Sequence, residues 1–376
     1  MTADVSRLHR VDMEDTLRPW LIPLICMLVG IAGRIAVAGL AGKGWLPDQL
    51  VHAYCKWDCS HYMAIAGSNY ETGISTSGSA NWPFFPMLPA VTALLHLTGL
   101  SLESAGTLAA TLASLVAARL AYGLCTTPRQ YLLFCAAVSF GPAALYFTIP
   151  YSESLFLLFT VVLQRALARG RYIGAGIAGA LLSATRLAGI FAGVSLLLTV
   201  LVQFRSRGRP WRDLPKMLWA EPAALLGLAL VPLGLGVFVV TLYLRMGDGL
   251  AFLHAQRLWY RDFANPITAV WDGLAGSSGE DRIKAIAALL GLAGAAVLLR
   301  QRQYAIAAFT GLCILAPLMT GLESMYRFVV TLAPLWLVLT AGLAQRRWST
   351  VLGLVALFVT GLYTNMAWLN GAHTLV

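Results

Sequence analysis

Long apolar runs separated by short polar segments dominate the pattern along the chain. A helix needs roughly 20 residues to cross a bilayer, and the runs predict an all-α polytopic membrane protein with about nine to eleven transmembrane helices. No repeat of heptad or longer period is evident. No polar block is long enough for a soluble domain, so residues 1–376 are predicted to form a single integral membrane domain.

Composition and charge agree with this prediction. Hydrophobic residues make up 58% of the chain and charged residues 12%, whereas soluble domains carry about 25% charged residues. The net charge is +10, and the basic residues cluster in short loops between apolar runs. That is the positive-inside pattern of membrane proteins, so nucleic-acid binding is not expected.

The basic residues also predict the orientation of the chain. Arg7, Arg10 and Arg18 place the N-terminus in the cytoplasm, ahead of a retained first membrane helix over residues 20–40. Residues 41–82 then form a first external loop with juxtamembrane helices, and residues 245–281 a second. Further inner loops are marked by basic residues around positions 119–129, 165–171, 205–216, 300–302 and 346–347.

Two segments do not fit a simple count of crossings. Residues 83–124 hold two apolar runs where one crossing is needed, so FFPMLPAVTALLHLTGL is predicted to be a re-entrant or partial helix unless one basic mark misleads. Residues 172–204 must cross outward and return. Fourteen residues of helix rise about 21 Å, less than the roughly 30 Å core, which places Arg186 within the membrane or at the floor of a cavity open to the outside.

The first external loop contains the stretch YCKWDCSHYMAIAGSNY, residues 54–70. It is too polar for hydrocarbon, and it includes Asp58, one of only 17 acidic residues in the chain. Lys56, Trp57, His61 and Tyr62 add nitrogen bases and aromatic faces beside this acid. The alternative is an interfacial amphipathic helix with a solvated carboxylate. The Gly/Ser-rich stretch that follows, residues 72–81, is predicted to be a mobile loop.

The six cysteines do not indicate a disulfide framework, because most of them fall inside apolar runs. Cys55 and Cys59 lie outside those runs. Their four-residue spacing on a helix disfavours a disulfide, and two cysteines alone make a poor metal site. We therefore expect both to be structural thiols.

Charges at membrane depth indicate function by default, because they are costly there. Arg186 in SATRLAGI is the clearest case, and the alternative is an arginine that snorkels to the interface from a helix end. Arg34, towards the outer end of the first helix, is interpreted as snorkelling in this way.

Two further acidic residues lie on the outer side. Glu153, in IPYSESLF, stands at a helix start, where a carboxylate can simply cap. Glu323 and Arg327, in GLESMYRFVV, are spaced i and i+4, which predicts an ion pair on a helix. Arg327 is also placed to bind a phosphate at the interface.

The second external loop is dense in polar and aromatic residues, among them Gln256 and Trp259. Such a mixture suits a sugar, although an aromatic belt at the interface is the alternative. The chain carries no Gly-rich phosphate loop, zinc motif or serine nucleophile elbow. An activated substrate must therefore arrive through the membrane or from the outer face.

Taken in order, several stretches resemble one family. The stretches are KWDCSHYMAIAGSNY, FFPMLP, PYSESLF, ATRLAGI, GDGLAFLHAQRLW and ESMYRFVVTLAP. Together they resemble the bacterial-type PIG-V mannosyltransferases, relatives of the second mannosyltransferase of the glycosylphosphatidylinositol pathway, within the GT-C class of membrane glycosyltransferases. The chain departs from the family pattern at Cys59, where Ser is usual, and at His61, where Trp is common, and both departures bear on the acceptor.

The resemblance implies an inverting transfer of a sugar, typically mannose, from a polyprenyl-phosphate donor to a lipid or glycan acceptor at the outer face of a bacterial plasma membrane. It implies that Asp58 is the catalytic base. The residues themselves assign the donor phosphate to Arg186 and Arg327, since a leaving phosphate needs cations. The remaining predicted substrate contacts are Lys56, Trp57, His61, Tyr62, Glu153, Gln256, Trp259 and Glu323. Neither a cofactor nor a metal ion is expected.

Two other classes compete with this hypothesis. Charges in membrane helices also mark transport paths, so a secondary transporter or flippase for a lipid-linked or small polar substrate is the main alternative. Transporters often show two related halves with interrupted helices, which are not evident here. A non-catalytic scaffold would leave Asp58 and both arginines without a task.

Overall fold

The computed structural model describes residues 18–74, 80–208, 210, 212, 221–256 and 263–372. These residues form helices and connecting loops and contain no strand. Arg7 and Arg10, half of the basic segment 205–216 and part of the predicted mobile loop 72–81 lie outside the described residues. The prediction of an all-α polytopic membrane protein is confirmed.

Within the described part of the chain, six helical stretches are long and apolar enough to cross a membrane. Four shorter apolar helices accompany them: α4 (Met87–His96), α8 (Tyr172–Thr185), α16 (Tyr304–Leu318) and α18 (Ala333–Leu343). The long stretches are built from α1 (Arg18–Leu40), α5 (Leu102–Ala121) with η2 (Tyr122–Leu124), η3 (Leu187–Phe191) with α9 (Ala192–Ser206), α11 (Pro222–Leu230) with α12 (Leu233–Met246), α15 (Gly279–Arg300) and α19 (Arg347–Leu369).

Two helices complete the bundle and five short ones connect it. The bundle helices are α6 (Pro128–Phe140) and α7 (Glu153–Ala168). The first long loop contains α2 (Pro47–Tyr54) and α3 (Asp58–Ser68), the juxtamembrane helices expected there. The other short helices are α13 (Ala251–His254), α14 (Pro266–Ala275) and α17 (Met325–Val330).

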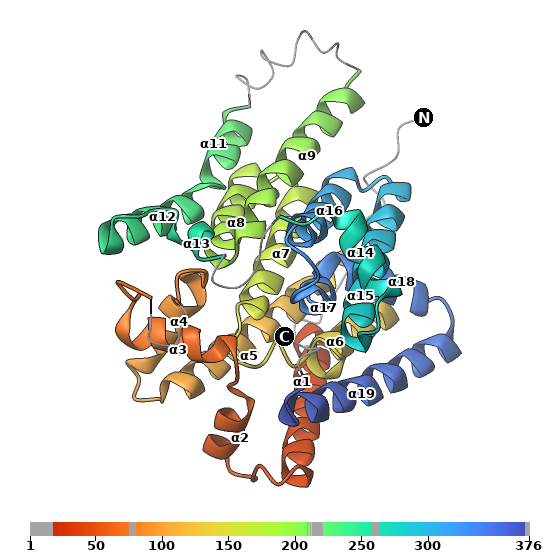
Figure 1. Ribbon diagram of the computed structural model, residues 1–376. Helices are drawn as coiled ribbons and strands as arrows, with labels where there is room; N and C mark the ends of the chain where they lie inside the picture. The colour runs from red at the N-terminus through yellow and green to blue at the C-terminus, as the bar shows by residue number, and fades with distance from the viewer. Residues whose placement is uncertain are drawn as a thin grey trace.

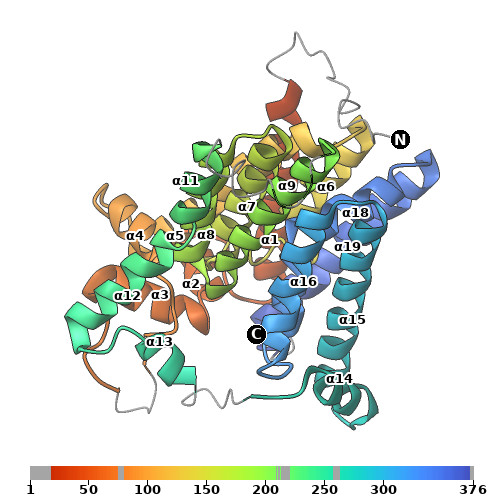
Figure 2. The ribbon, with the colours of Figure 1, turned by 90° about the horizontal axis from the view of Figure 1, so that it is seen from above.

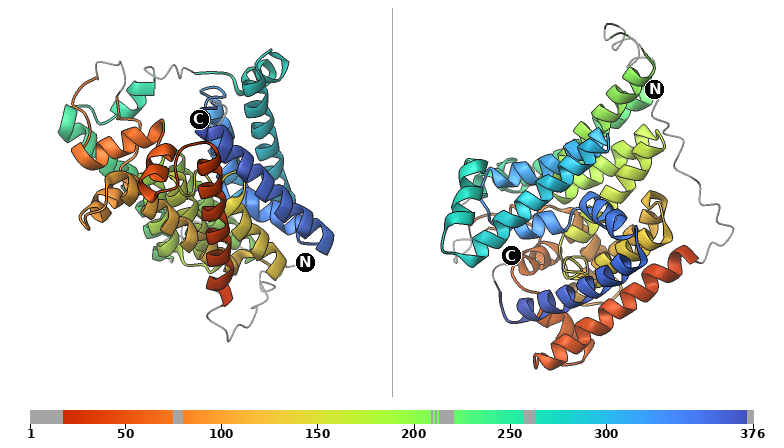
Figure 3. Two further views of the ribbon diagram at one scale, coloured as in Figure 1. Left: turned by 90° about the horizontal axis from the view of Figure 1, so that it is seen from below. Right: turned by 90° about the vertical axis from the view of Figure 1, so that its right-hand side faces the viewer.

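Helix α7 lies near the middle of the bundle and packs against both α5 and α8 (Figure 1). Helices α1 and α19 run side by side, as the right-hand view of Figure 3 shows, and both pack on α6. A Cβ added at Gly30 of α1 would come within 2.0 Å of the Ser139 carbonyl oxygen. At Gly361 of α19 it would come within 1.9 Å of the Phe140 carbonyl oxygen. These glycines therefore allow the first and last helices to approach the end of α6 closely.

Residues 83–124 and 172–204, which did not fit the predicted number of membrane crossings, each contain a short helix. Helix α4 has 10 residues, so it rises about 15 Å and is too short to cross. It packs on α3 and α5, as a partial helix would. Helix α8 has 14 residues and stops at Arg186, where the backbone is extended before η3 begins. Arg186 thus marks a break between two helices rather than a position inside one.

The loop between α1 and α4 shares a cluster of aromatic side chains with later helices. Tyr70, Phe85 and Phe252 surround the ring of Phe238, with ring centroids 4.5 to 5.6 Å from it. These rings join the first external loop to α12 and α13, which lie close together in Figure 2. The packing fixes the first loop against the bundle instead of leaving it in solvent.

Candidate active site

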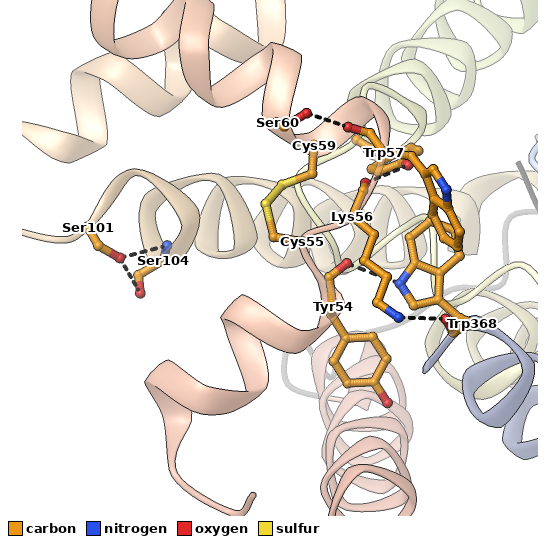
Figure 4. Close-up of a disulfide and its surroundings, with 10 residues drawn as sticks. Tyr54, Cys55, Lys56, Trp57, Cys59, Ser60, Ser101, Ser104 and Trp368 are labelled. Carbon is orange, nitrogen blue, oxygen red and sulfur yellow. Dashed lines mark hydrogen bonds between the residues drawn. A yellow bond between two sulfur atoms is a disulfide. The ribbon is translucent and has the colours of Figure 1, made fainter. Parts of the chain in front are cut away.

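The turn between α2 and α3 is closed by a disulfide between Cys55 and Cys59, with Cα atoms 5.3 Å apart (Figure 4). The prediction of two free thiols is therefore wrong. It assumed one continuous helix, whereas α2 ends at Tyr54 and α3 begins at Asp58. The break brings the two sulfur atoms together and ties the start of α3 to the end of α2.

The same turn presents Asp58. Trp57 has a φ of 49°, a left-handed value that is uncommon for a residue other than glycine. This reversal starts α3 abruptly, so that Asp58 occupies its first turn. A carboxylate is favoured there by the helix dipole.

The end of α19 fixes the turn from the other side. The Lys56 ammonium donates to the carbonyl oxygens of Trp368 and Leu369 at 3.1 and 2.9 Å. The Trp368 indole donates to the Tyr54 carbonyl and packs edge-on against Trp57, with ring centroids 4.4 Å apart (Figure 4). Lys56 and Trp57, predicted to contact substrate, thus hold the turn in place.

Asp58 meets an arginine that is buried between two carboxylates. The Arg327 Nη1 atom donates to Asp58 Oδ2 at 2.7 Å, and its Nε atom lies 3.2 Å from Glu153 Oε1. The side chain of Arg327 is 7% exposed, that of Glu153 2%, and that of Asp58 17%. Asp58 is therefore the accessible end of this row of charges. Within the described residues, its second oxygen, Oδ1, accepts no hydrogen bond.

Arg186 joins the same row through Glu153. Its Nη1 atom donates to Glu153 Oε1 at 3.1 Å, so one carboxylate oxygen serves both arginines. The Arg186 guanidinium lies 4.3 Å from the ring centre of Phe328. At 19% exposure it is more accessible than Arg327. We call Asp58, Arg327, Glu153 and Arg186 the charged row; its charges sum to zero.

The expected ion pair between Glu323 and Arg327 does not form. Glu323 instead lies 3.3 Å from Lys284 of α15, and it is 55% exposed. The i to i+4 argument required one helix, but Ser324 has a φ of 59° and α17 begins only at Met325. Glu153, by contrast, does begin α7, and there its carboxylate binds two arginines.

His61 and Tyr62 pack around Phe84, a residue of the FFPMLP stretch. His61 stacks on the Phe84 ring with centroids 4.6 Å apart, and Tyr62 meets it edge-on at 5.2 Å. Burial lowers the pKa of His61, against the opposing effect of the nearby Asp58 and Glu71 carboxylates. Burial, with the charges of Glu153 and Asp58, raises the pKa of Tyr62. Both side chains near Asp58 are therefore uncharged at pH 7.

In the described part of residues 245–281, the polar side chains of residues 248–256 form contacts within their own segment. Gln256 donates to the Phe252 carbonyl, and His254 pairs with Asp248 at 2.7 Å on the surface. In the described part of the chain, no hydrogen bond or ion pair joins Gln256 to the charged row. Trp259 lies outside the described residues.

Three aromatic residues that the sequence did not single out also shape this region. The Tyr151 hydroxyl donates to the Lys56 carbonyl, and its ring lies 5.2 Å from the Arg327 guanidinium. Phe328 packs against the Arg186 guanidinium, and Trp368 packs against Trp57 of the Asp58 turn. Tyr151 and Phe328 stand beside Glu153 and Arg327 in the quoted stretches, which was a usable signal. Nothing in the sequence pointed to Trp368.

No group of three or more His, Cys, Asp or Glu side chains that could hold a metal ion occurs among the residues that the structure describes. Metal independence stays a prediction. The chemistry available at the charged row is that of one accessible carboxylate and two guanidinium groups.

Neither a protein-family model nor a curated protein matches the sequence. Among solved structures, the chain is similar to the crystal structure of the Archaeoglobus fulgidus oligosaccharyltransferase in complex with Zn and sulfate, with 13% sequence identity and a TM-score of 0.46. The match covers 92% of this chain and 53% of that one, so the chain spans about half the length of that protein.

Proposed function

We propose that this protein is an inverting membrane glycosyltransferase of the GT-C class, similar to the PIG-V mannosyltransferases. It would move a sugar, mannose by the resemblance, from a polyprenyl-phosphate donor to a lipid or glycan acceptor on the outer face of the membrane. The charged row carries the proposal, because it combines an accessible carboxylate with two arginines. The positive-inside pattern predicts that it lies at the outer end of the membrane bundle.

The chemistry is a single displacement at the anomeric carbon. An acceptor hydroxyl attacks that carbon from the face opposite the phosphate, its oxygen forms the new glycosidic bond, and the bond from carbon to phosphate oxygen breaks. The electron pair leaves with the polyprenyl phosphate. Asp58 accepts the hydroxyl proton, a task that requires hydrogen-bond reach and an available oxygen such as Oδ1.

The two arginines take different parts in this scheme. Arg186 is the more exposed guanidinium and binds the departing phosphate, where charge develops as the bond breaks. Arg327 is enclosed by Asp58 and Glu153, so it also orients the base. Asp58 is thereby held by a charge-assisted hydrogen bond rather than left free to rotate.

The disulfide supports placing the site on the outer face. Disulfides persist in oxidising compartments and are rare in the cytosol. The Cys55–Cys59 bond borders Asp58, and the positive-inside pattern favours the same outer side for this loop.

Purified protein incubated with radiolabelled polyprenyl-phosphate mannose and a crude lipid extract should yield a labelled product together with free polyprenyl phosphate. A transporter or flippase would move the lipid across a vesicle membrane and leave the glycosyl phosphate intact. Labelling from a nucleotide sugar but not from the lipid-linked donor would contradict the proposal.

A further inference from the structure

A second set of polar groups, separate from the charged row, faces a pocket of about 310 Å³ between α1, α2 and α5. Apolar side chains form most of its wall, including Ile31 and Trp45, and both of these are exposed on the molecule's surface. Its polar lining includes Arg34, Tyr54, Thr107 and Thr111. The pocket is partly open and has no role in the chemistry proposed above.

Arg34 differs from the snorkelling arginine that we expected. One guanidinium nitrogen donates to the Ser139 carbonyl of α6 at 3.2 Å. Within the described residues, no carboxylate pairs with it and its other guanidinium N–H groups make no hydrogen bond. An arginine within a membrane helix is costly unless a partner stabilises it. The pocket therefore presents an uncompensated positive charge.

Two threonines of α5 add hydroxyl groups to the same pocket. Thr107 and Thr111 are spaced by four residues, so they share one face of the helix. In the described part of the molecule, neither hydroxyl makes a hydrogen bond. Together with the remaining guanidinium N–H groups of Arg34 they form a set of donors without an acceptor, which matches the oxygen atoms of a phosphate group.

The position and shape of the pocket favour a lipid. Arg34 is six residues from the end of α1 at Leu40, or about 9 Å along the helix axis, near the interface predicted to face outside. A volume of 310 Å³ is at the low end of the roughly 300 to 1,000 Å³ usual for small-molecule sites. It accommodates a head group and the first carbons of a chain, while the remaining hydrocarbon can lie on the exposed apolar surface of α1.

We propose that this pocket binds an anionic phospholipid, with its phosphate on Arg34, Thr107 and Thr111 and part of one acyl chain against Ile31 and Trp45. The site is independent of the proposed transfer reaction, since its phosphate ligands are not members of the charged row. Tyr54 lines the pocket and also accepts the Trp368 indole N–H through its carbonyl. Bound lipid would therefore contact Tyr54, which ends α2 just before the turn that carries Asp58.

The test is lipid binding by the purified full-length protein, measured by native mass spectrometry after delipidation. Phosphatidylglycerol, phosphatidylcholine and farnesyl phosphate are added back in turn. Wild-type protein should bind phosphatidylglycerol at least about tenfold more tightly than phosphatidylcholine. Only phosphatidylglycerol has a net negative charge to pair with Arg34. Arg34→Gln should remove that preference. Arg119→Gln, an arginine of α5 that stacks on Trp20 and does not line the pocket, is the matched control and should keep it.

A second variant covers the case in which Arg34→Gln does not fold. Thr107→Val with Thr111→Val keeps the shape of both side chains, and it should weaken phosphatidylglycerol binding several-fold. Equal binding of the two phospholipids by the wild-type protein would overturn the proposal, as would unchanged binding in the threonine variant. Displacement of phosphatidylglycerol by equimolar farnesyl phosphate would also overturn it, because the pocket would then be a prenyl-phosphate site.

Discussion

The two regions predicted to be external loops carry similar side chains but differ in what those side chains contact. In residues 54–70, Asp58 reaches α17 through Arg327, and Lys56 reaches the end of α19. In residues 248–256, Asp248 pairs with His254 six positions away and both side chains are exposed. A dense set of polar and aromatic residues is thus a weak sign of a site. Charged contacts with distant elements, formed where side chains are buried, distinguish the first region from the second.

The largest expected effect comes from replacing an acidic residue in each region and comparing the rates of sugar transfer. Asp58→Asn keeps the shape of the side chain and removes its basicity, so sugar transfer should fall by at least about 100-fold. Asp248→Asn changes an exposed acid and should leave the rate within about twofold of wild type. Both rates are measured with radiolabelled donor, and a thermal melt checks that each variant folds. An Asp58→Asn protein with near-normal turnover would remove the distinction.

Arg327→Gln tests whether burial of the charged row affects stability. The substitution leaves two carboxylates near one another without their shared cation, and breaking a buried ion pair in this way costs about 3–5 kcal/mol. We expect a marked loss of thermal stability in detergent. Glu153 still pairs with Arg186, so a double variant that also carries Asp58→Asn removes the carboxylate left without a cation and should recover part of the loss. Lys284→Gln, whose partner Glu323 is largely exposed, is the comparison. An equal loss in both single variants would mean that burial between carboxylates is not the cause.

Cys55→Ser with Cys59→Ser opens the turn that carries Asp58. Closure of so short a loop contributes about 2 kcal/mol in the chain-entropy account. We expect a modest loss of stability and a lower kcat with little change in KM for the donor, because Asp58 would be less well positioned. Cys125→Ser, which removes a free cysteine elsewhere, is the control. If the open-turn variant keeps its full kcat, the disulfide does not position the base.

The smallest effect concerns pH. Because burial lowers the pKa of His61 in the folded protein, the unfolded chain takes up a proton first as pH falls below the ordinary value of 6.5. The free energy of unfolding should therefore decrease towards acid pH, and His61→Phe should reduce that decrease while keeping the stack on Phe84. Melting temperatures at pH 7.5 and 5.5 measure the difference. Identical pH dependence in both proteins would show that His61 does not contribute.

The sequence predicted features that follow from local pattern and missed those that depend on breaks in helices. The apolar runs predicted the bundle, and the short helix that ends just before Arg186 was also predicted. The predictions that Glu323 pairs with Arg327 and that Cys55 is a free thiol were wrong for one reason. Both arguments assumed a continuous helix where Trp57 and Ser324 have left-handed backbone conformations. The partners of Glu153 could not be read from spacing, because Arg186 is 33 positions away and Arg327 lies on another element.

The contact between Lys56 and the end of α19 has a consequence for how the protein is made. The two partners are 312 and 313 positions apart in the chain. At roughly 5 to 20 residues per second, a ribosome needs about 15 to 60 seconds to synthesise the intervening segment. With the topology proposed here, the Asp58 turn would already be outside the membrane during that time, without the indole of Trp368 and without these two acceptors for the Lys56 ammonium. The turn reaches its final form only when the last helix inserts, so a nascent chain that stalls before residue 368 leaves an open turn.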